Sequence, residues 1–215
     1  MATNFAGPGP TPAPGSTGSG RAGGVRVILG LLAVMWVLEM VDLVLGHRLD
    51  ALGIQPRDLD GLAGVVTAPF LHFGFGHLVA NTIPFAVLGL IIALGGAVRV
   101  LTVTVIAALV SGAGVWLLAP APSVTVGASG IVFGYAAYLI ARGVVDRSLP
   151  YLAIGAVVVA VWGTGLLAGV VPQAGVSWLG HLFGAAGGVL AARLLRRDRA
   201  AAADHARLST GDLGT

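Results

Sequence analysis

Residues 100–141 read VLTVTVIAALVSGAGVWLLAPAPSVTVGASGIVFGYAAYLIA, and no charged side chain occurs among them. A helix that crosses the hydrocarbon core of a bilayer needs about 20 apolar residues, so this stretch is long enough for two crossings. The segment APAPSVTVG near its middle holds two prolines and is the natural place for the chain to turn. The stretch therefore predicts two membrane-spanning helices joined by an uncharged loop.

The composition of the whole chain points to the same environment. Of its 215 residues, 56% are hydrophobic and 10% are charged, and the mean hydropathy is +0.93. Water-soluble proteins carry about 25% charged residues, so this chain cannot cover a water-facing surface with polar side chains. The composition excludes an ordinary soluble enzyme and a disordered chain. The absence of Cys excludes disulfides and thiolate metal sites.

The same length criterion predicts six spans and thus an all-α polytopic membrane protein. The predicted spans are Val27–Gly46, His77–Leu94, Val100–Ala119, Gly127–Ala141, Pro150–Val171 and Trp178–Leu195. Residues 1–24, rich in Gly, Pro and Ser, are predicted to form a disordered cytoplasmic tail. Residues 25–197 would form the membrane domain and residues 198–215 a flexible cytoplasmic tail. The fourth span is shorter than the others, which indicates a helix that begins below the membrane surface.

The arginines predict the orientation, because basic residues gather on the cytoplasmic side. All 12 basic residues are Arg. With the N-terminus inside, the cytoplasmic set is Arg21, Arg26, Arg99, Arg142, Arg147, Arg193, Arg196, Arg197, Arg199 and Arg207. Only Arg48 and Arg57 fall outside, in a long connection (47–76) that is apolar enough to lie partly in the outer interface. Both termini are therefore predicted to be cytoplasmic. Because the arginines flank apolar runs, no nucleic-acid partner is expected.

Polar side chains inside the predicted spans are the first candidates for function, since an unpaired polar group in an apolar medium costs several kcal/mol. Ser129, in VGASGIVFG, stands at a predicted helix start. Free backbone N–H groups and the positive end of the helix dipole there would stabilise an oxyanion; an ordinary N-cap is the alternative. His181, in SWLGHLFGAAGG, is the natural base, with a core or pore-lining histidine as the alternative.

Glycine spacing gives a reason to bring these two residues together. Gly180, Gly184 and Gly188 recur every four residues around His181, and Gly130 and Gly134 follow Ser129. Stripes of small residues let membrane helices approach closely. The fourth and sixth spans are therefore predicted to pack against each other, with His181 beside Ser129.

His77 and Asn81 are four residues apart and so share one helix face. Both donate hydrogen bonds without a fixed charge, which suits oxyanion stabilisation; capping of the helix is the alternative. His72, His77 and His181 are the alternative candidates for metal ligands, but no H-E-x-x-H motif or following acid accompanies them. Neither a metal nor a cofactor is expected at this site.

Glu39 and Asp42 lie in the last two turns of the first span. Acidic residues inside a membrane are usually functional, but these two fall near the outer interface. We interpret them as structural groups and expect them to pair with Arg48 or Arg57.

Three separated motifs resemble one family. GASG at 127–130, H-x4-H-x3-N at 72–81 and GHLFG at 180–184 resemble those of the rhomboid intramembrane serine proteases, in the same order, over residues 26–197. The resemblance implies that Ser129 is the nucleophile and His181 the general base, a dyad without an aspartate. It also implies that the side chains of His77 and Asn81 donate hydrogen bonds to the oxyanion. The residues that would support the site are His72, Gly127, Gly130 and Phe133.

The resemblance further implies hydrolysis of a peptide bond in or beside a transmembrane segment of a single- or multi-span membrane protein. The site would open to the outer side of a membrane, and the Arg-only, Ala- and Gly-rich composition favours a bacterial plasma membrane. Two positions depart from the family. No Trp occurs between residues 37 and 115 to form the usual Trp-Arg pair of the first loop, and Arg48 and Arg57 are the candidates to substitute for it. Phe133 replaces a Tyr, although its ring can still pack against His181.

Two other functions remain open at this point. An inactive rhomboid-like protein that retains or chaperones membrane clients would have the same fold, and loss of the Ser or the His would mark it. A small transporter with His181 lining a pathway would carry inverted repeats, and none is evident in the sequence.

Overall fold

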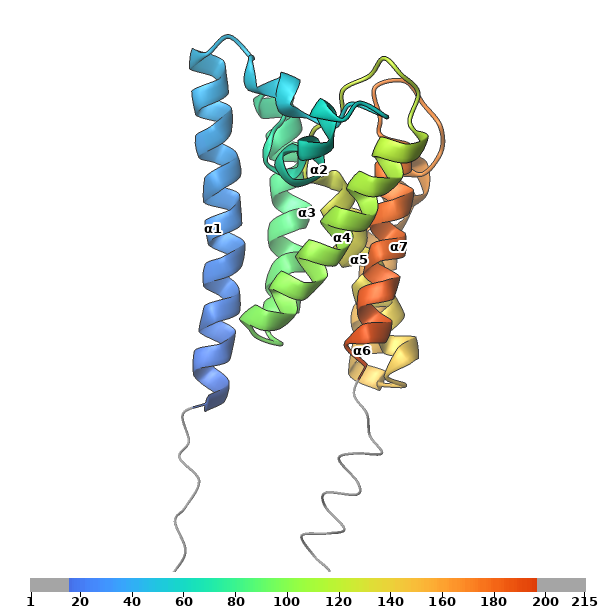
Figure 1. Cartoon of the computed structure of the whole chain (residues 1–215). Helices are drawn as coiled ribbons and strands as arrows, with labels where there is room; N and C mark the ends of the chain where they lie inside the picture. The colour runs from blue at the N-terminus through green and yellow to red at the C-terminus, as the bar shows by residue number, and fades with distance from the viewer. Residues whose placement is uncertain (1–15, 197–215) are drawn as a thin grey trace, which may run out of the picture.

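The computed structural model describes residues 16–196, which form an all-helical bundle (Figure 1). In chain order the helices are α1 (Ser16–Val44), α2 (Gly64–Thr67), α3 (Phe75–Ala93), α4 (Ala97–Leu118), α5 (Ser129–Val145), α6 (Leu149–Gly169) and α7 (Trp178–Leu194). Short 3-10 helices cover Leu49–Leu52, Asp60–Ala63 and Ala68–Phe70. Figure 1 places the start of α1 and the end of α7 at the same end of the bundle.

Four of the described helices, α1, α3, α4 and α6, are long and apolar enough to cross a membrane. Helix α5 is a shorter apolar helix of 17 residues, and α7 also has 17 residues. At 1.5 Å per residue such a helix is about 26 Å long, less than the roughly 30 Å of a bilayer core. The predicted fourth span is short, as expected, but α7, the predicted sixth span, is equally short. The count of six crossings stays a prediction.

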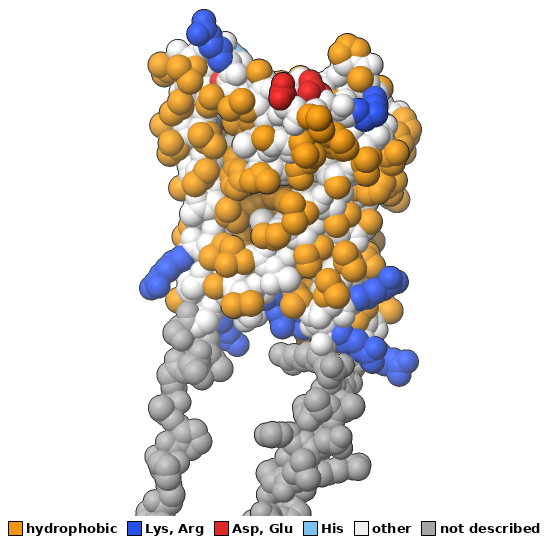
Figure 2. Space-filling view, viewed as in Figure 1, with side chains coloured by type: hydrophobic (Ala, Val, Ile, Leu, Met, Phe, Trp, Pro, Cys, Tyr) orange, Lys and Arg blue, Asp and Glu red, His pale blue; other side chains and the backbone are white. Residues whose placement is uncertain are grey.

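The sides of the bundle are apolar. Figure 2 shows hydrophobic side chains over its flank and charged side chains at its two ends. Large apolar side chains such as Val41, Val105 and Val159 are exposed along α1, α4 and α6. Exposed apolar surfaces of this extent mark contact with a partner or a membrane.

Helix α1 begins earlier than the sequence predicted, at Ser16 instead of after residue 24. The glycines of this segment permit close packing against the turn between α3 and α4. A Cβ atom on Gly24 would lie 2.8 Å from the Ala93 carbonyl oxygen, so only glycine fits there without a shift. The rest of the predicted N-terminal tail and the predicted tail at 198–215 lie outside the described residues.

Helix α5 continues past its predicted end at Ala141, because Arg142 is neutralised instead of solvated. Arg142 is fully buried and forms an ion pair of 3.0 Å with Asp146, one turn later on the same helix. Its guanidinium also donates to the Tyr138 hydroxyl and lies over the Tyr151 ring, 4.7 Å from the centroid. A buried charge is tolerated when it is paired and hydrogen-bonded in this way.

The predicted pairing of α5 with α7 is confirmed. A side chain at Gly184 would overlap the Gly130 carbonyl, and one at Gly188 would overlap the Gly134 carbonyl. The glycine stripes therefore bring the two backbones into direct contact. Helix α4 crosses both helices obliquely (Figure 1).

The long connection between α1 and α3 is fastened to the C-terminal end of α4. The Arg57 guanidinium donates to the carbonyl oxygens of Leu117, at 3.2 Å, and Ala119, at 2.8 Å. The Trp116 indole donates to the Asp58 carbonyl at 2.8 Å. Arg57 thus anchors the loop where the family's Trp-Arg pair is missing. The expectation that Glu39 and Asp42 pair with Arg48 or Arg57 is not met within the described residues. The Arg57 guanidinium binds these helix-end carbonyls, and the ion pair of Asp42 is with His47.

Candidate active site

Ser129 stands at the first position of α5, where the sequence placed it. Ala128 is the N-cap, so the Ser129 N–H is among the backbone donors that have no partner within the helix. Gly127 has φ +116, a conformation that residues with a side chain rarely adopt. A Cβ atom there would also lie 2.6 Å from Cε1 of His77. Gly127 therefore permits both the turn into α5 and the close approach of α3.

The side chains of Ser129 and His181 meet across the α5–α7 contact. His181 Nε2 lies 2.9 Å from Ser129 Oγ, and His181 is 8% exposed. The other ring nitrogen, Nδ1, lies 2.8 Å from the carbonyl oxygen of Gly169. A carbonyl oxygen only accepts hydrogen bonds, so this contact requires the hydrogen on Nδ1. Nε2 then carries the lone pair and accepts the hydrogen of the Ser129 hydroxyl.

Gly169 and Phe133 hold the imidazole in this orientation. Gly169 is the last residue of α6, so its carbonyl is one of the helix-end acceptors without an intrahelical partner. The Phe133 ring stacks on the His181 ring, with centroids 4.1 Å apart and planes 4° from parallel. This confirms that a phenyl ring packs there without the phenol. A side chain on Gly169 would overlap Phe133, which explains the glycine.

His77 and Asn81 line the other side of the turn that precedes Ser129. The Phe73 N–H donates to His77 Nδ1 at 3.4 Å, so the hydrogen of the neutral ring is on Nε2. Asn81 donates one hydrogen of its amide to the His77 carbonyl at 3.1 Å. Its amide nitrogen lies 3.6 Å from the position that a Cβ atom on Gly127 would take. Both side chains therefore keep a donor available beside Gly127.

His72 contacts the backbone of the same turn. Its Nε2 accepts a hydrogen bond from the Ala128 N–H at 3.4 Å. Its ring meets the His77 ring edge-on, with centroids 5.1 Å apart. Burial lowers the pKa of His72 to about 4, and the neighbouring His77 acts in the same direction. His72 is therefore neutral at pH 7 and able to accept this bond.

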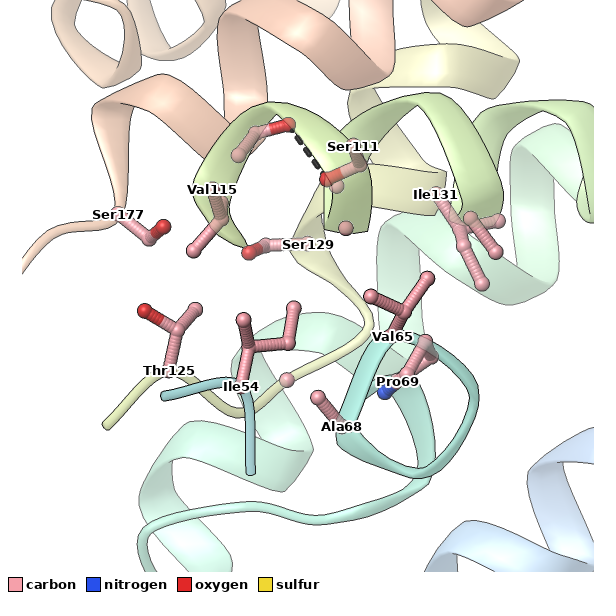
Figure 3. A pocket seen from close by; sticks show the side chains of 15 residues that line it. Ile54, Val65, Ala68, Pro69, Ser111, Val115, Thr125, Ser129, Ile131 and Ser177 are labelled. Carbon is pink, nitrogen blue, oxygen red and sulfur yellow. Dashed lines mark hydrogen bonds between the residues drawn. The ribbon is translucent and has the colours of Figure 1, made fainter. Parts of the chain in front are cut away.

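A small cavity opens beside Ser129, between α4, α5, α7 and the long connection (Figure 3). It has about 20 Å³ of space for water, enough for about one molecule. Four hydroxyl-bearing residues border it: Ser111, Thr125, Ser129 and Ser177. Ser111 donates to the Gly180 carbonyl at 2.8 Å, so it fastens α4 to the helix that carries His181.

The roles of Gly169 and Ser111 were not predicted from the sequence. Gly169 acts through its carbonyl, which every residue has, so no side chain signals its role. Ser111 was detectable by the criterion used for Ser129, because it is a polar residue inside a predicted span next to Gly112.

The comparisons with known proteins agree with this fold. Residues 60–198 match the Rhomboid domain family. An uncharacterized protein of Mycobacterium tuberculosis (strain ATCC 25618 / H37Rv) is 42% identical over 181 residues, which cover 80% of this chain and 75% of that protein. An uncharacterized protein of Mycobacterium leprae (strain TN) is 41% identical over 204 residues, which cover 87% of this chain and 80% of that protein. With its several apolar helices, the chain is an integral membrane protein that belongs to the rhomboid family.

Proposed function

We propose that this protein is an intramembrane serine endopeptidase that hydrolyses peptide bonds in or near transmembrane segments of single- or multi-span membrane proteins. The observation that carries the proposal is the 2.9 Å contact between Ser129 Oγ and His181 Nε2, with Nδ1 of the same ring held by the Gly169 carbonyl. A nucleophile, a base within hydrogen-bond reach and a group that orients the base are the three parts of an activated serine.

The first chemical step is attack of Ser129 Oγ on a substrate carbonyl carbon. As the bond forms, the hydroxyl proton passes to His181 Nε2, and the ring becomes an imidazolium. The Gly169 carbonyl then accepts from a positively charged donor, which strengthens that hydrogen bond. Because Gly169 ends α6, the negative end of the helix dipole also stabilises the positive ring. A backbone carbonyl thus takes the orienting role that a carboxylate has in a triad.

The negative charge of the tetrahedral intermediate develops on the former carbonyl oxygen. Donors that flank the 127–129 turn are the Ser129 N–H, Nε2–H of His77 and the second amide hydrogen of Asn81. Their positions relative to Gly127 support an oxyanion site at the start of α5. His181 next gives its proton to the leaving amine, and an acyl-enzyme remains on Ser129. Water in the adjacent cavity would hydrolyse this ester by the same base.

The proposed arrangement in the membrane has six crossings and both termini in the cytoplasm of a bacterium. The described ends of α1 and α7 lie together at one end of the bundle, and ten of the 12 arginines fall in the segments assigned to that side. The site would open to the outer side, because the connections before α5 and before α7 lie at the opposite end. A substrate helix must unwind there to expose its carbonyl.

A fluorophosphonate probe for serine hydrolases tests the proposal on the purified, detergent-solubilised protein. We expect labelling of the wild type and none of Ser129→Ala, together with cleavage of a single-span reporter in liposomes by the wild type alone. A rhomboid-like protein that only binds its clients would show neither labelling nor cleavage. Cleavage that persists in Ser129→Ala would overturn the proposed nucleophile.

A further inference from the structure

A second cluster of ionisable side chains lies at the outer end of α1, away from Ser129. Asp42 is in the last turn of the helix, and His47 and Asp50 follow it in the connection to α3. One possible ligand atom from each of the three lies within 4.8 Å of the others. The turn brings His47 back over the helix, since its N–H donates to the Asp42 carbonyl at 2.8 Å. Its Nδ1 then lies 3.6 Å from Asp42 Oδ2.

Glu39, a buried acid on the same helix, lies next to this cluster. It is three residues before Asp42, on the same helix face, and it is 2% exposed. Neither of its carboxylate oxygens has a hydrogen-bond partner among the described residues. Its carboxylate interacts electrostatically with Asp42, Asp50 and His47. The Gly74 N–H also interacts with this carboxylate, but its hydrogen bond goes to the His72 carbonyl, at 2.9 Å.

Asp50 also has an unpaired carboxylate oxygen: its Oδ1 is buried and has no hydrogen-bond partner in the described part of the chain. Asp42 accepts the Leu49 N–H through Oδ1 at 2.7 Å, which leaves Oδ2 facing His47. Within residues 16–196, no arginine forms an ion pair with any of these three carboxylates. Three neighbouring carboxylates, of which Glu39 and Asp42 are each 2% exposed, are costly to bury without a counter-charge.

We propose that Asp42, His47 and Asp50 bind one divalent cation of the zinc or manganese class, with the Glu39 carboxylate as a further ligand or counter-charge beneath it. An imidazole with carboxylates suits zinc and manganese, whereas calcium takes oxygen ligands alone. Ligand atoms around a tetrahedral zinc ion are about 3.3 Å apart. The present spacing therefore needs only a small contraction, which the exposed His47 side chain permits.

The cation would fasten the outer end of α1 to the chain that leads to the candidate active site. Asp42 belongs to α1 and Asp50 to the connection, while Glu39 faces the Gly74 backbone at the entry to α3. Gly74 is two residues after His72 and three before His77. The role of the cation is structural, so the proposal does not depend on the proposed protease activity.

The test is titration of Zn²⁺ into the full-length protein, without an affinity tag, after it has been stripped with EDTA in detergent. Isothermal titration calorimetry should show one equivalent of zinc per chain. Asp50→Asn and His47→Ala should each weaken binding by about tenfold or more, since each removes one ligand. Asp58→Asn, in the same outer connection, is the matched control and should bind as the wild type does. Zinc should also raise the Tm of the wild type but not of Asp50→Asn.

Several results would overturn this assignment. Zinc affinity that is unchanged in both Asp50→Asn and His47→Ala would place the metal elsewhere, for example on the histidines near Ser129. Zinc binding that is lost in His181→Ala would do the same. Calcium binding that survives His47→Ala would contradict the imidazole ligand. Absence of any saturable zinc or manganese binding by the folded wild type would remove the site altogether.

Discussion

His181 donates the hydrogen of Nδ1 to the carbonyl oxygen of Gly169, at 2.8 Å. The base is therefore oriented by the last carbonyl of α6 and not by an ionised side chain. The acceptor cannot be deleted by changing a side chain, but the position of the helix end can be disturbed. Any movement of the end of α6 would alter the direction in which Nε2 points at Ser129.

Gly169→Ala should lower the activity while leaving most of the stability. The added methyl would overlap the Phe133 ring and lie 3.1 Å from His181 Nδ1. Overpacking of this kind costs about 1–3 kcal/mol of folding stability. Because the added methyl also presses on the His181 ring, we expect kcat on a single-span reporter to fall about tenfold or more. Gly165→Ala is the control on the same helix, because a Cβ atom at Gly165 meets nothing within 4 Å. Equal activity of the two variants would show that His181 tolerates displacement of this carbonyl.

Single substitutions should separate the chemical roles of the polar residues. Ser129→Ala should abolish cleavage, and His181→Ala should come close to it, because an unactivated hydroxyl is a poor nucleophile at neutral pH. Asn81→Ala should be milder, with a loss of about 10²–10³ in kcat, since other donors to the oxyanion remain. His77→Ala should be similar or somewhat worse. The variants are compared on one reporter after their folding has been matched by circular dichroism.

The result that would contradict this ranking concerns Asn81. If Asn81→Ala folds normally and is as inactive as Ser129→Ala, the amide does more than share an oxyanion. A second substitution, Asn81→Asp, keeps the shape of the side chain but replaces the donor with an acceptor. If Asn81 donates a hydrogen bond to the oxyanion, this variant should be less active than Asn81→Ala.

The sequence predicted the meeting of Ser129 and His181 because helix packing in membranes depends on side-chain size. Small residues at four-residue spacing have a direct structural consequence, and the contacts of Gly184 with Gly130 bear it out. Likewise, the scarcity of polar groups in the spans singled out the same few side chains that the structure gathers around Gly127. Both signals depend only on residue type and spacing, so they can be detected in the sequence without knowledge of the fold.

Other features depended on contacts that residue type does not encode. The Gly169 carbonyl, the burial of Arg142 and the start of α1 at Ser16 each follow from which surfaces happen to meet. Asp42 was expected to pair with an arginine, yet the turn after α1 places His47 beside it. Such local turns depend on a few backbone angles, among them φ +61 at His47, which a hydropathy pattern does not specify.

Gly184→Leu should separate α5 from α7 and lower both the activity and the Tm. A side chain at this position would overlap the Gly130 carbonyl, and Gly130 follows the nucleophile directly. The helix axes must move apart, which lengthens the 2.9 Å contact between Ser129 and His181. Gly30→Leu on α1 serves as the control, since a Cβ atom there meets nothing within 4 Å. Unchanged activity and melting in Gly184→Leu would disprove the tight packing of these two helices.

Acid should destabilise the protein through His72 as the pH falls from about 6.5 to about 4. The folded state holds the pKa of His72 at about 4, from an ordinary value of 6.5, so between these values the unfolded chain binds a proton that the folded chain does not. The free energy of unfolding therefore falls as the pH decreases through this window, by up to about 1.4 kcal/mol per pH unit. Below about pH 4 both states are protonated and the dependence levels off. By pH 5 the loss from His72 amounts to about 2 kcal/mol.

The measurement is the Tm of the detergent-solubilised protein at pH 7 and pH 5, for the wild type and for His72→Asn. The asparagine cannot titrate, and its carbonyl can still accept from the Ala128 N–H, so its Tm should drop less on acidification even if it starts lower. The same drop in both proteins would mean that His72 is protonated as easily in the folded state as in the unfolded one, and that its contact with Ala128 does not require a neutral ring.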